Sequence, residues 1–305
     1  MSTTKTESKT RRVFRDIHAG HLETEASLRR FRNLITTDYL RLDSDFFRTR
    51  TCADLGAGSA AHGTVNLLNL GARLVHALDL DEDFKASAEA VLGGFPEFAD
   101  RWRVDVGSLS GLPYADGAFD FVLCQGVLHH VEDDLAALRE IHRVLGDGGK
   151  AYVAVAGAGG IMTRIFFGTL RDEYGTNRDF ARLVDTASAD WVRDQLAFLA
   201  AKLEDDGTEQ HRQARMLLDA LAGLIDRDFL LTVRDRLQAP IYRTYAERDF
   251  ADMLRRVGFR EWYRVSRRPH YRNLRRVVSY LYGDPGHPLA RLLYGDGALN
   301  VVATK

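Results

Sequence analysis

In the stretch CADLGAGSAAHG, from Cys52 to Gly63, an apolar run ends at two glycines that lie two positions apart. The pattern predicts a strand followed by a tight turn, because glycine reaches backbone conformations closed to other residues and lets a ligand approach closely. A helix is expected directly after the turn. Strand, glycine turn and helix in this order are typical of the first unit of a parallel α/β sheet. The stretch therefore predicts a fold class and a ligand at the turn.

Two ligand classes fit this turn. Gly56, Gly58 and Ala61 follow the Gly-x-Gly-x-x-Ala fingerprint of dinucleotide sites, which would indicate an oxidoreductase. Asp54, Gly56 and Gly58 also read as Asp-x-Gly-x-Gly, which suits a nucleoside that has no pyrophosphate. A carboxylate at Asp54 would repel a pyrophosphate and attract a cationic amino acid group. The acid therefore favours the second class.

Strands and helices alternate outward from the turn over residues 51–157. Strands are expected at 51–58, 73–81, 102–106, 119–128 and 150–157, and helices at 60–71, 83–94 and 133–149. The strands are almost continuously apolar, which predicts a parallel sheet covered by helices on both faces. Ligands bind such sheets at the carboxyl ends of the strands. The polar residues expected at those ends are Asp54, Asp79, Asp105 and Gln125.

The flanking segments follow other patterns. Residues 11–48 have the apolar period of one or two amphipathic helices (Val13, Ile17, Leu22, Leu28, Phe31), after a polar, basic start expected to be disordered. Residues 158–243 read as helices only, and Phe180, Leu183, Val184 and Trp191 are expected to form their core. A helix over 244–258 is expected to begin with a capping box of Thr244 and Glu247. Two last strands are expected at 259–267 and 298–305.

Four segments of the chain resemble the class I S-adenosylmethionine-dependent methyltransferases, in the branch that methylates small molecules. They are ADLGAG (53–58), HALDLD (76–81), VDVGSLSGLPYADGAFDFVLCQGVLHHVED (104–133) and LREIHRVLGDGGKAYVAV (138–155). The resemblance implies a Rossmann-like, mostly parallel sheet of seven strands with helices on both faces and an antiparallel last strand. On this basis we expect an N-terminal helical arm (1–50), a cofactor-binding core (51–157), a helical lid insertion (158–243) and a C-terminal completion of the sheet (244–305).

The resemblance also assigns roles to single residues. The cofactor is S-adenosylmethionine, and its expected contacts are Asp54 near the methionine amino group, Gly56 and Gly58 at the backbone turn, Asp79 at the ribose hydroxyls with Leu80 beside the adenine, Asp105 and Val106 at the adenine, and Gln125 at the methionine end. Ala60 stands where a third glycine often occurs in the family, which is a mild departure.

Candidate catalytic residues follow the fourth expected strand. His129 and His130 lie at the edge of the expected cofactor site, where one of them could act as a general base near neutral pH. The alternative interpretation is that the pair is a structural start of the next helix. His62, Tyr242 and Tyr245 are the candidate substrate-binding residues. The ten histidines do not group with acids at ligand spacings, so no metal site is expected.

The composition of the chain limits the classes of binding partner that we expect. The net charge of −1 exerts no pull on nucleic acid or anionic membranes, and no apolar run approaches a membrane span. The two cysteines read as reduced core thiols, and we expect a cytoplasmic protein with a small-molecule substrate and neither nucleic acid nor membrane as a partner. The arginine-rich segment 255–276 reads as a solvated face, with an anion site as its alternative. The oligomeric state stays open.

The sequence therefore predicts methyl transfer by direct displacement to a small molecule, in specialised metabolism. Three alternatives remain. One is a methyltransferase for RNA or protein, supported only by the arginine-rich segment. Another is an NAD-dependent oxidoreductase, which Asp54 disfavours. The last is a cofactor-binding module without catalysis.

Overall fold

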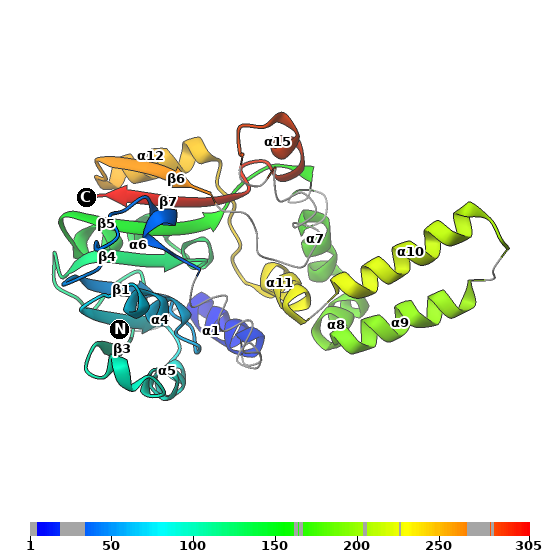
Figure 1. Ribbon diagram of the computed structural model, residues 1–305, viewed down its shortest axis with the longest axis horizontal. Helices are drawn as coiled ribbons and strands as arrows, with labels where there is room; N and C mark the ends of the chain where they lie inside the picture. Colours follow the sequence, from blue (N-terminus) through cyan, green and yellow to red (C-terminus); the bar gives the residue numbers. More distant parts are fainter. Residues whose placement is uncertain are drawn as a thin grey trace.

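A computed structural model describes residues 5–18, 34–161, 164, 167–203, 206–225, 227–266, 281 and 284–305. Its centre is a seven-stranded sheet in the order β3-β2-β1-β4-β5-β7-β6 (Figure 1). The strands are β1 (Thr51–Leu55), β2 (Leu74–Asp79), β3 (Trp102–Val106), β4 (Phe119–Gln125), β5 (Leu145–Ala156), β6 (Glu261–Val265) and β7 (Ala298–Thr304). The first five are parallel, and β7 pairs antiparallel with both β5 and β6. The predicted fold class is confirmed.

Apolar side chains of the central strands alternate between two core layers, as buried strands require. Val122 and Cys124 of β4 enter one layer, and Phe121 and Leu123 enter the other. The first layer is covered by α6 (Asp134–Val144) and α12 (Glu247–Val257). The second is covered by α3 (Thr37–Leu40), α4 (His62–Asn69) and α5 (Phe84–Gly93). Helices therefore cover both faces, and the carboxyl ends of the parallel strands stay available for a site.

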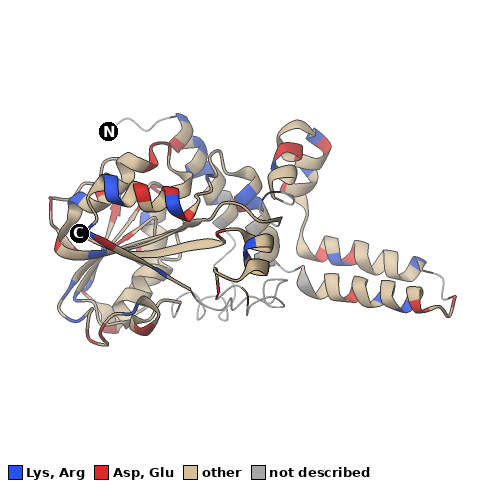
Figure 2. Ribbon diagram, turned by 90° about the horizontal axis from the view of Figure 1, so that it is seen from above, with Lys and Arg blue, Asp and Glu red and all other residues tan. Residues whose placement is uncertain are grey.

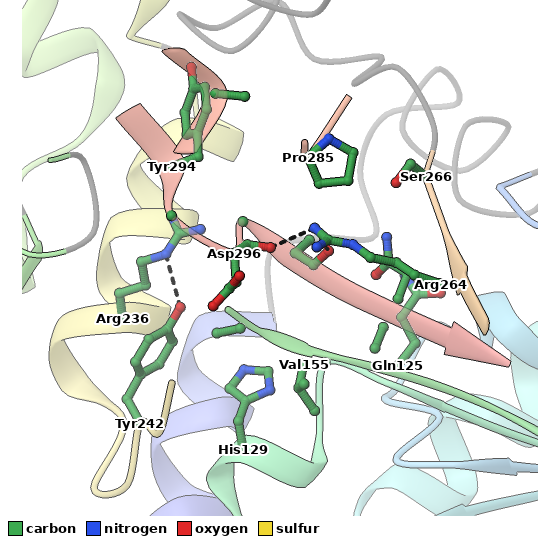
Figure 3. Close-up of a pocket in the computed structure, with 18 of the residues that line it drawn as sticks. Gln125, His129, Val155, Arg236, Tyr242, Arg264, Ser266, Pro285, Tyr294 and Asp296 are labelled. Carbon is green, nitrogen blue, oxygen red and sulfur yellow. Dashed lines mark hydrogen bonds between the residues drawn. The ribbon is translucent and has the colours of Figure 1, made fainter. Parts of the chain in front are cut away.

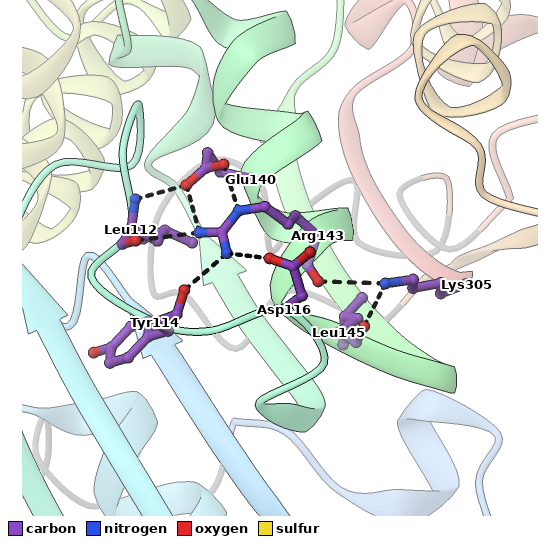
Figure 4. A network of polar contacts seen from close by, with 7 residues as sticks. All are labelled: Leu112, Tyr114, Asp116, Glu140, Arg143, Leu145 and Lys305. Carbon is purple, nitrogen blue, oxygen red and sulfur yellow. Dashed lines mark hydrogen bonds and ion pairs between the residues drawn. The ribbon is translucent and has the colours of Figure 1, made fainter.

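The run that carries most of the family resemblance is held together by Arg143 of α6 (Figure 4). Its guanidinium donates to Glu140 at 2.7 and 2.8 Å, to Asp116 at 2.8 Å and to the Tyr114 carbonyl at 2.8 Å. Glu140 in turn accepts from the Leu112 N–H at 2.8 Å. The arginine beside Glu140 holds the pKa of that carboxyl below its ordinary value. This network fastens the loop before β4 to α6.

Two expected element boundaries are wrong. The helix expected over 133–149 ends at Val144, because Leu145 pairs with Phe119 and begins β5 in a glycine-rich stretch that forms helix poorly. The capping box of Thr244 and Glu247 does not form, since Ala246 is the N-cap of α12 and makes no side-chain cap. The Glu247 N–H instead donates to the Asp296 carboxylate at 3.2 Å. The Asp296 carboxylate, which is distant in sequence, therefore accepts a hydrogen bond at the start of α12 in place of the expected Thr244 hydroxyl.

The N-terminal residues expected to be disordered form a helix from residue 5, namely α1 (Lys5–His18). It lies across the carboxyl ends of the parallel strands (Figure 1). Arg15 donates two hydrogen bonds to Asp81, just after β2. It also forms an ion pair with Asp83 at 2.7 Å. The basic side chains of the N-terminus therefore pair with the acidic turn after β2. The positions Leu22, Leu28 and Phe31 lie outside the described residues.

The block expected as a lid contains α7 (Thr169–Thr176), α8 (Arg178–Thr186), α9 (Ala189–Lys202), α10 (Glu209–Leu224) and α11 (Arg227–Gln238). Only part of it stands near the strand ends. In Figure 1, α7 and α11 lie beside the sheet, whereas α9 and α10 project away from it. The expected core positions Leu183 and Trp191 are exposed, so that expectation is wrong for both.

Candidate cofactor and acceptor site

The glycine turn after β1 has the backbone that the sequence predicts. Gly56 and Gly58 both have positive φ values, +78° and +63°. A Cβ at Gly56 would lie 2.3 Å from a methyl of Val127, whereas a Cβ at Gly58 would meet nothing within 4 Å. Gly56 is therefore required by internal packing. Gly58 borders open space, as a backbone that receives a ligand should.

Asp79 ends β2 beside this turn. One of its oxygens accepts from the Gly58 N–H at 3.0 Å, and the other accepts from the Asp81 N–H at 3.1 Å. Burial raises the pKa of this carboxyl, and the backbone N–H donors oppose that shift. Each oxygen keeps a further lone pair. The residue therefore suits two hydroxyl donors of a ribose at the mouth of the turn.

Asp54 lies beneath the first turn of α4, with only 4% of its surface exposed. Its Oδ2 accepts from the Thr64 hydroxyl at 2.8 Å. Burial raises the pKa of Asp54 to about 7, against the opposing effect of Thr64. A Cβ at Gly63 would lie 2.7 Å from both carboxyl oxygens, so the glycine makes room for the acid. A cation brought nearby would favour its ionised form.

The two residues expected at the adenine are placed differently from each other. Asp105 Oδ2 accepts from the Tyr114 hydroxyl at 2.9 Å and lies 3.0 Å from His76 Nδ1. Its carboxylate is therefore already engaged within the protein. Val106 is exposed at the end of β3. An adenine contact by either residue stays a prediction. Ser108, which the sequence reasoning missed, lies just beyond β3 and donates to Glu7 of α1.

A cavity of about 260 Å³ opens at the carboxyl ends of β4 and β5 (Figure 3). Gln125 and His129 line it after β4, and Val155 lines it near the end of β5. Further walls come from α11, from the region of Arg264 and Ser266, and from the segment that precedes β7. Of the candidates from sequence, the cavity brings together Gln125, His129 and Tyr242.

His129 is buried in the cavity wall, with 7% of its surface exposed. Figure 3 shows its ring pointing into the cavity between Tyr242 and Val155. Among the described residues, its Nδ1 has no hydrogen-bond partner. Burial, followed by the charges of His130 and Arg236, holds the pKa of His129 well below its ordinary value. The imidazole is therefore neutral at physiological pH and able to accept a proton.

His130 has a different setting from its neighbour, although the two ring centroids are 4.1 Å apart. Its Nδ1 lies 2.7 Å from the Ile241 carbonyl, which makes that nitrogen the donor and fixes the tautomer. Its Nε2 lies 3.6 Å from Asp235, and Phe14 of α1 contacts the ring at 4.7 Å. His130 thus joins three segments, which matches the structural interpretation of the pair.

The aromatic candidates separate as well. Tyr242 lines the cavity, and its hydroxyl accepts from Arg236 Nε at 3.2 Å. Tyr245, expected in the substrate pocket, is buried in the core and donates to Asp134 at 2.7 Å. It is absent from the cavity lining, because its backbone bonds to Ala156 and Ala158 turn the ring inward. His62 begins α4 and is also absent from that lining.

One wall of the cavity depends on close backbone contact. The Gly157 N–H donates to the Gly297 carbonyl at 2.6 Å, and the Asp296 N–H donates to the Ala158 carbonyl at 2.8 Å. A Cβ at Gly160 would lie 2.3 Å from the Gly295 nitrogen. The glycines on both segments let them lie against each other. The sequence gives no sign of this contact, since the two segments are distant along the chain.

Residues 53–153 match the family described as "Methyltransferase domain". This match covers the glycine turn, Asp79, His129 and His130. Residues 53–153 form a class I S-adenosylmethionine-dependent methyltransferase domain. S-adenosylmethionine is the cofactor of this methyltransferase domain, and the open turn at Gly58 beside Asp79 fits its nucleoside.

Individual relatives are more distant. "Uncharacterized protein YafE" of Escherichia coli (strain K12) is 36% identical over 87 residues, which are 28% of this chain and 40% of that protein. A Burkholderia thailandensis 1,6-didemethyltoxoflavin-N1-methyltransferase structure is similar over 98% of this chain and 87% of its own, with 17% identity and a TM-score of 0.48. A Mesorhizobium loti S-adenosylmethionine-dependent methyltransferase is similar over 87% and 94%, with 18% identity and a TM-score of 0.47.

Within the described parts of the chain, none of the helices has the length and apolar character needed to cross a bilayer.

Proposed function

We propose that the protein transfers the methyl group of S-adenosylmethionine to a small-molecule acceptor seated in the cavity beside His129. The observation that carries this proposal is the placement of a buried, neutral histidine in a 260 Å³ cavity at the ends of β4 and β5, next to the cofactor turn. A cavity of this size suits a small metabolite rather than a polymer chain. Specialised metabolism and a cytoplasmic location remain part of the proposal.

The chain's own residues divide the work. The turn at Gly58 and the Asp79 carboxylate hold the nucleoside, and Asp54 faces the amino group of its methionine part. Bound there, S-adenosylmethionine supplies an electrophilic methyl group on a sulfonium. Its positive charge would lower the raised pKa of Asp54, so cofactor binding and loss of the Asp54 proton are coupled.

His129 and Tyr242 act on the acceptor. An acceptor hydroxyl in the cavity would give its proton to the neutral His129 imidazole as its oxygen bonds to the methyl carbon and the carbon–sulfur bond of the sulfonium breaks. A protonated amine would give up its proton before the attack, because the nitrogen needs its lone pair to form the new bond. The Tyr242 hydroxyl, fixed by Arg236, would orient the acceptor by a hydrogen bond. Val155 and its neighbours Ala154 and Ala156 give the acceptor an apolar surface to pack against on the side of β5.

Cofactor binding tests the first half of this proposal. Calorimetry of the full chain with S-adenosylmethionine should give a saturable signal, and NADH should give none. Asp79→Ala should weaken S-adenosylmethionine binding at least tenfold, whereas Glu97→Ala, an exposed acid after α5, should leave it unchanged. Unchanged affinity in Asp79→Ala would place the cofactor elsewhere.

The class of molecule that receives the methyl group tests the second half of the proposal. A panel of small hydroxyl and amine compounds is incubated with labelled S-adenosylmethionine, alongside total RNA and a protein extract. We expect label in small molecules only, and its rate should fall at least 100-fold in His129→Gln. Transfer to RNA or protein would contradict the proposed acceptor class while leaving the cofactor site intact.

A further inference from the structure

Arg236 places a positive charge in the wall of the cavity beside His129. It lies in the last turn of α11 and is half-buried. Its Nε donates to the Tyr242 hydroxyl at 3.2 Å (Figure 3), and its guanidinium carbon lies 4.3 Å from the centroid of the Phe167 ring. The two contacts fix the orientation of the guanidinium, because its plane stacks on the aromatic ring. A cation fixed in the wall of a small cavity is suited to bind an anion.

Two kinds of hydrogen-bond donor meet at this wall. A guanidinium carries five N–H donors in one plane, and the Tyr242 hydroxyl accepts from one of them. Because that hydroxyl accepts from Arg236, it keeps its own proton to donate. A carboxylate accepts from two neighbouring donors at once, and it binds a charged donor more strongly than a neutral carbonyl does. The pair therefore suits a carboxylate.

Two other charged side chains in the cavity wall already have partners of opposite charge. Arg264 pairs with Glu247 at 2.8 Å. Asp296 lies 3.9 Å from Arg291 and also accepts from the Glu247 N–H at 3.2 Å. Each of these charges is therefore compensated within the protein.

The remaining acid in the described lining of the cavity, Asp235, faces His130, whose Nε2 lies 3.6 Å away. Burial lowers the pKa of His130, and the charge of Asp235 opposes that shift. Burial also lowers the pKa of His129, and there the charges of His130 and Arg236 add to the shift. The charge of Arg236 therefore reaches the side of the cavity where His129 lies, and a negative group there is stabilised.

Arg171 of α7 fixes the turn that carries this cation. Its guanidinium donates to four successive backbone carbonyls around the end of α11, at 2.6, 3.3, 2.6 and 3.4 Å, namely those of Arg236, Leu237, Ala239 and Pro240. Carbonyls at the end of a helix have no N–H partner within the helix, so this one side chain supplies it. Arg171 is absent from the cavity lining. It therefore acts on the cavity through Arg236.

We propose that Arg236 and Tyr242 bind a carboxylate of the acceptor, and that Arg171 is the positioning residue for this pair. The acceptor is then a small organic acid whose hydroxyl or amine faces His129. The His129 and Tyr242 ring centroids are 5.4 Å apart, so one small molecule reaches both. The carboxylate holds the molecule and takes no part in the transfer. This inference rests on the proposed function, because it names the class of acceptor at the same site.

Binding of small probes tests the anion site without turnover. Benzoate, benzamide and benzylamine are similar in size and differ in charge. Calorimetry of the full chain near neutral pH should show benzoate binding about tenfold more tightly than benzamide, because the amide lacks the charge. Arg236→Gln should remove this preference, whereas Arg182→Gln, at an exposed arginine of α8, should keep it. Equal binding of benzoate and benzamide, no binding of benzoate, or tighter binding of benzylamine would overturn the proposal.

S-adenosylmethionine carries a carboxylate of its own, so its affinity is measured in the same variants. Arg236→Gln should leave that affinity within twofold of the wild type. A loss of tenfold or more would assign Arg236 to the cofactor and overturn its role toward the acceptor.

A double-mutant cycle tests Arg171. Arg171→Gln should weaken benzoate binding several-fold and leave benzamide and S-adenosylmethionine binding unchanged. The same change made in Arg236→Gln should cause no further loss, because the group that it positions is already gone. Arg171→Lys, which keeps the charge, repeats the measurement if Arg171→Gln lowers the melting temperature. Equal losses for benzoate and benzamide, or additive losses in the double variant, would show a structural role only.

Matched acceptors separate this inference from the proposed function. Labelled S-adenosylmethionine is offered to acids and their amides, such as salicylate with salicylamide and anthranilate with anthranilamide. We expect the label chiefly in the acids, and Arg236→Gln should lose this preference. Equal label in both members of each pair would overturn the carboxylate site and leave the proposed function standing. No label in any pair would contradict the proposed methyl transfer, and this acceptor class with it.

Discussion

At the scale of single residues, Asp54 shows how a ligand site can be built at a cost to the free protein. Its carboxyl is enclosed by β1, Thr64 and the start of α4, and burial raises its pKa to about 7. A buried carboxyl without a cation is less stable when ionised. Residues of this kind are typical of sites that are completed by a charged ligand.

Asp54→Asn should change how stability depends on pH. In the wild type the folded state holds this proton more tightly than the unfolded state, so the free energy of unfolding falls as pH rises from about 4 to about 7. The asparagine removes this part of the slope and can still accept from Thr64. Thermal unfolding at pH 5 and pH 8 measures it.

Asp43→Asn, at an exposed acid outside the site, is the matched control and should keep the wild-type slope. A slope that survives in Asp54→Asn would show that another group causes it. The same variant should also lose the pH dependence expected for cofactor affinity. In the wild type that affinity rises from pH 6 to pH 8, values on either side of the pKa of about 7, because the ammonium group of the cofactor favours the ionised form.

His129→Gln should lower kcat at least 100-fold, as removal of a general base does, with S-adenosylmethionine affinity within twofold of the wild type. Because the pKa of His129 is well below its ordinary value, the wild-type kcat should stay level as pH falls through 6.5. Steady-state kinetics across pH measure both effects. An equal loss of kcat and cofactor affinity would assign His129 a structural role instead.

At the scale of elements, the Arg143 network explains why one run of sequence identifies the family so well. Leu112 and Tyr114 pack on the core, and side-chain bonds to α6 fix the backbone of the loop 112–116 that carries them (Figure 4). The position of β4 and the cavity after it depend on that loop. A pattern maintained for packing can therefore look like a functional signature.

Arg143→Ala should lower the free energy of unfolding by about 2 kcal/mol, because it leaves the partly buried Glu140 and the Tyr114 carbonyl without their donor. Urea unfolding measures this loss. Arg139→Ala removes an exposed arginine of the same helix and should cost less than about 0.5 kcal/mol. Equal losses in the two variants would show that the network adds no stability.

The helix α1 should control access to the cofactor site. It bridges the segments after β2, β3 and β4 through Arg15, Glu7 and Phe14. Arg15→Glu places a negative charge against Asp81 and Asp83 and should speed cofactor release several-fold. Stopped-flow fluorescence measures the release rate. Arg12→Glu makes the same change at an exposed position of α1 and should leave the rate unchanged.

The sheet could be predicted because its signals are local. Apolar strands, the glycine turn and the acid at Asp79 all lie within short segments, and the predicted 102–106 is β3 as found. The partners of α1 could not be predicted, since Arg15 and Asp81 meet only in the folded chain. The hydrogen bond between Tyr245 and Asp134 could not be predicted for the same reason, because the two residues are distant in sequence. The opposite charges of Arg15 and Asp81 are the sign of this contact that the two segments carry.

The helices within residues 158–243 could be predicted, but their arrangement in space could not. Helical periodicity shows which residues share a side of a helix and not whether that side is covered, so Leu183 and Trp191 are predicted inside although both are exposed. The cavity was also out of reach, since five separate segments meet around it. Five arginines of the segment 255–276 lie outside the described residues, namely Arg267, Arg268, Arg272, Arg275 and Arg276.

At the scale of the whole molecule, the helices α9 and α10, which project from the body of the molecule (Figures 1 and 2), and the methyltransferase domain should be separable. Replacing residues 190–222 by a short Gly-Ser linker removes most of α9 and α10 and, within the described chain, one buried side chain, His211. The variant should keep the melting temperature within a few degrees and keep S-adenosylmethionine affinity. Scanning and titration calorimetry measure these two properties. Loss of cofactor binding would show that the two parts depend on each other.

The strand order has a consequence for how the chain is made. β6 pairs only with β7 in the described sheet, and β7 lies between β5 and β6 although it follows both in the sequence. During synthesis β6 is made before its only neighbour in the described sheet. At roughly 5–20 residues per second, the segment up to β7 takes several seconds to produce. Until β7 is made, the strand edges of β5 and β6 that it will pair with are open to other chains being synthesised on the same messenger RNA. The sheet is complete only when β7 lies between them.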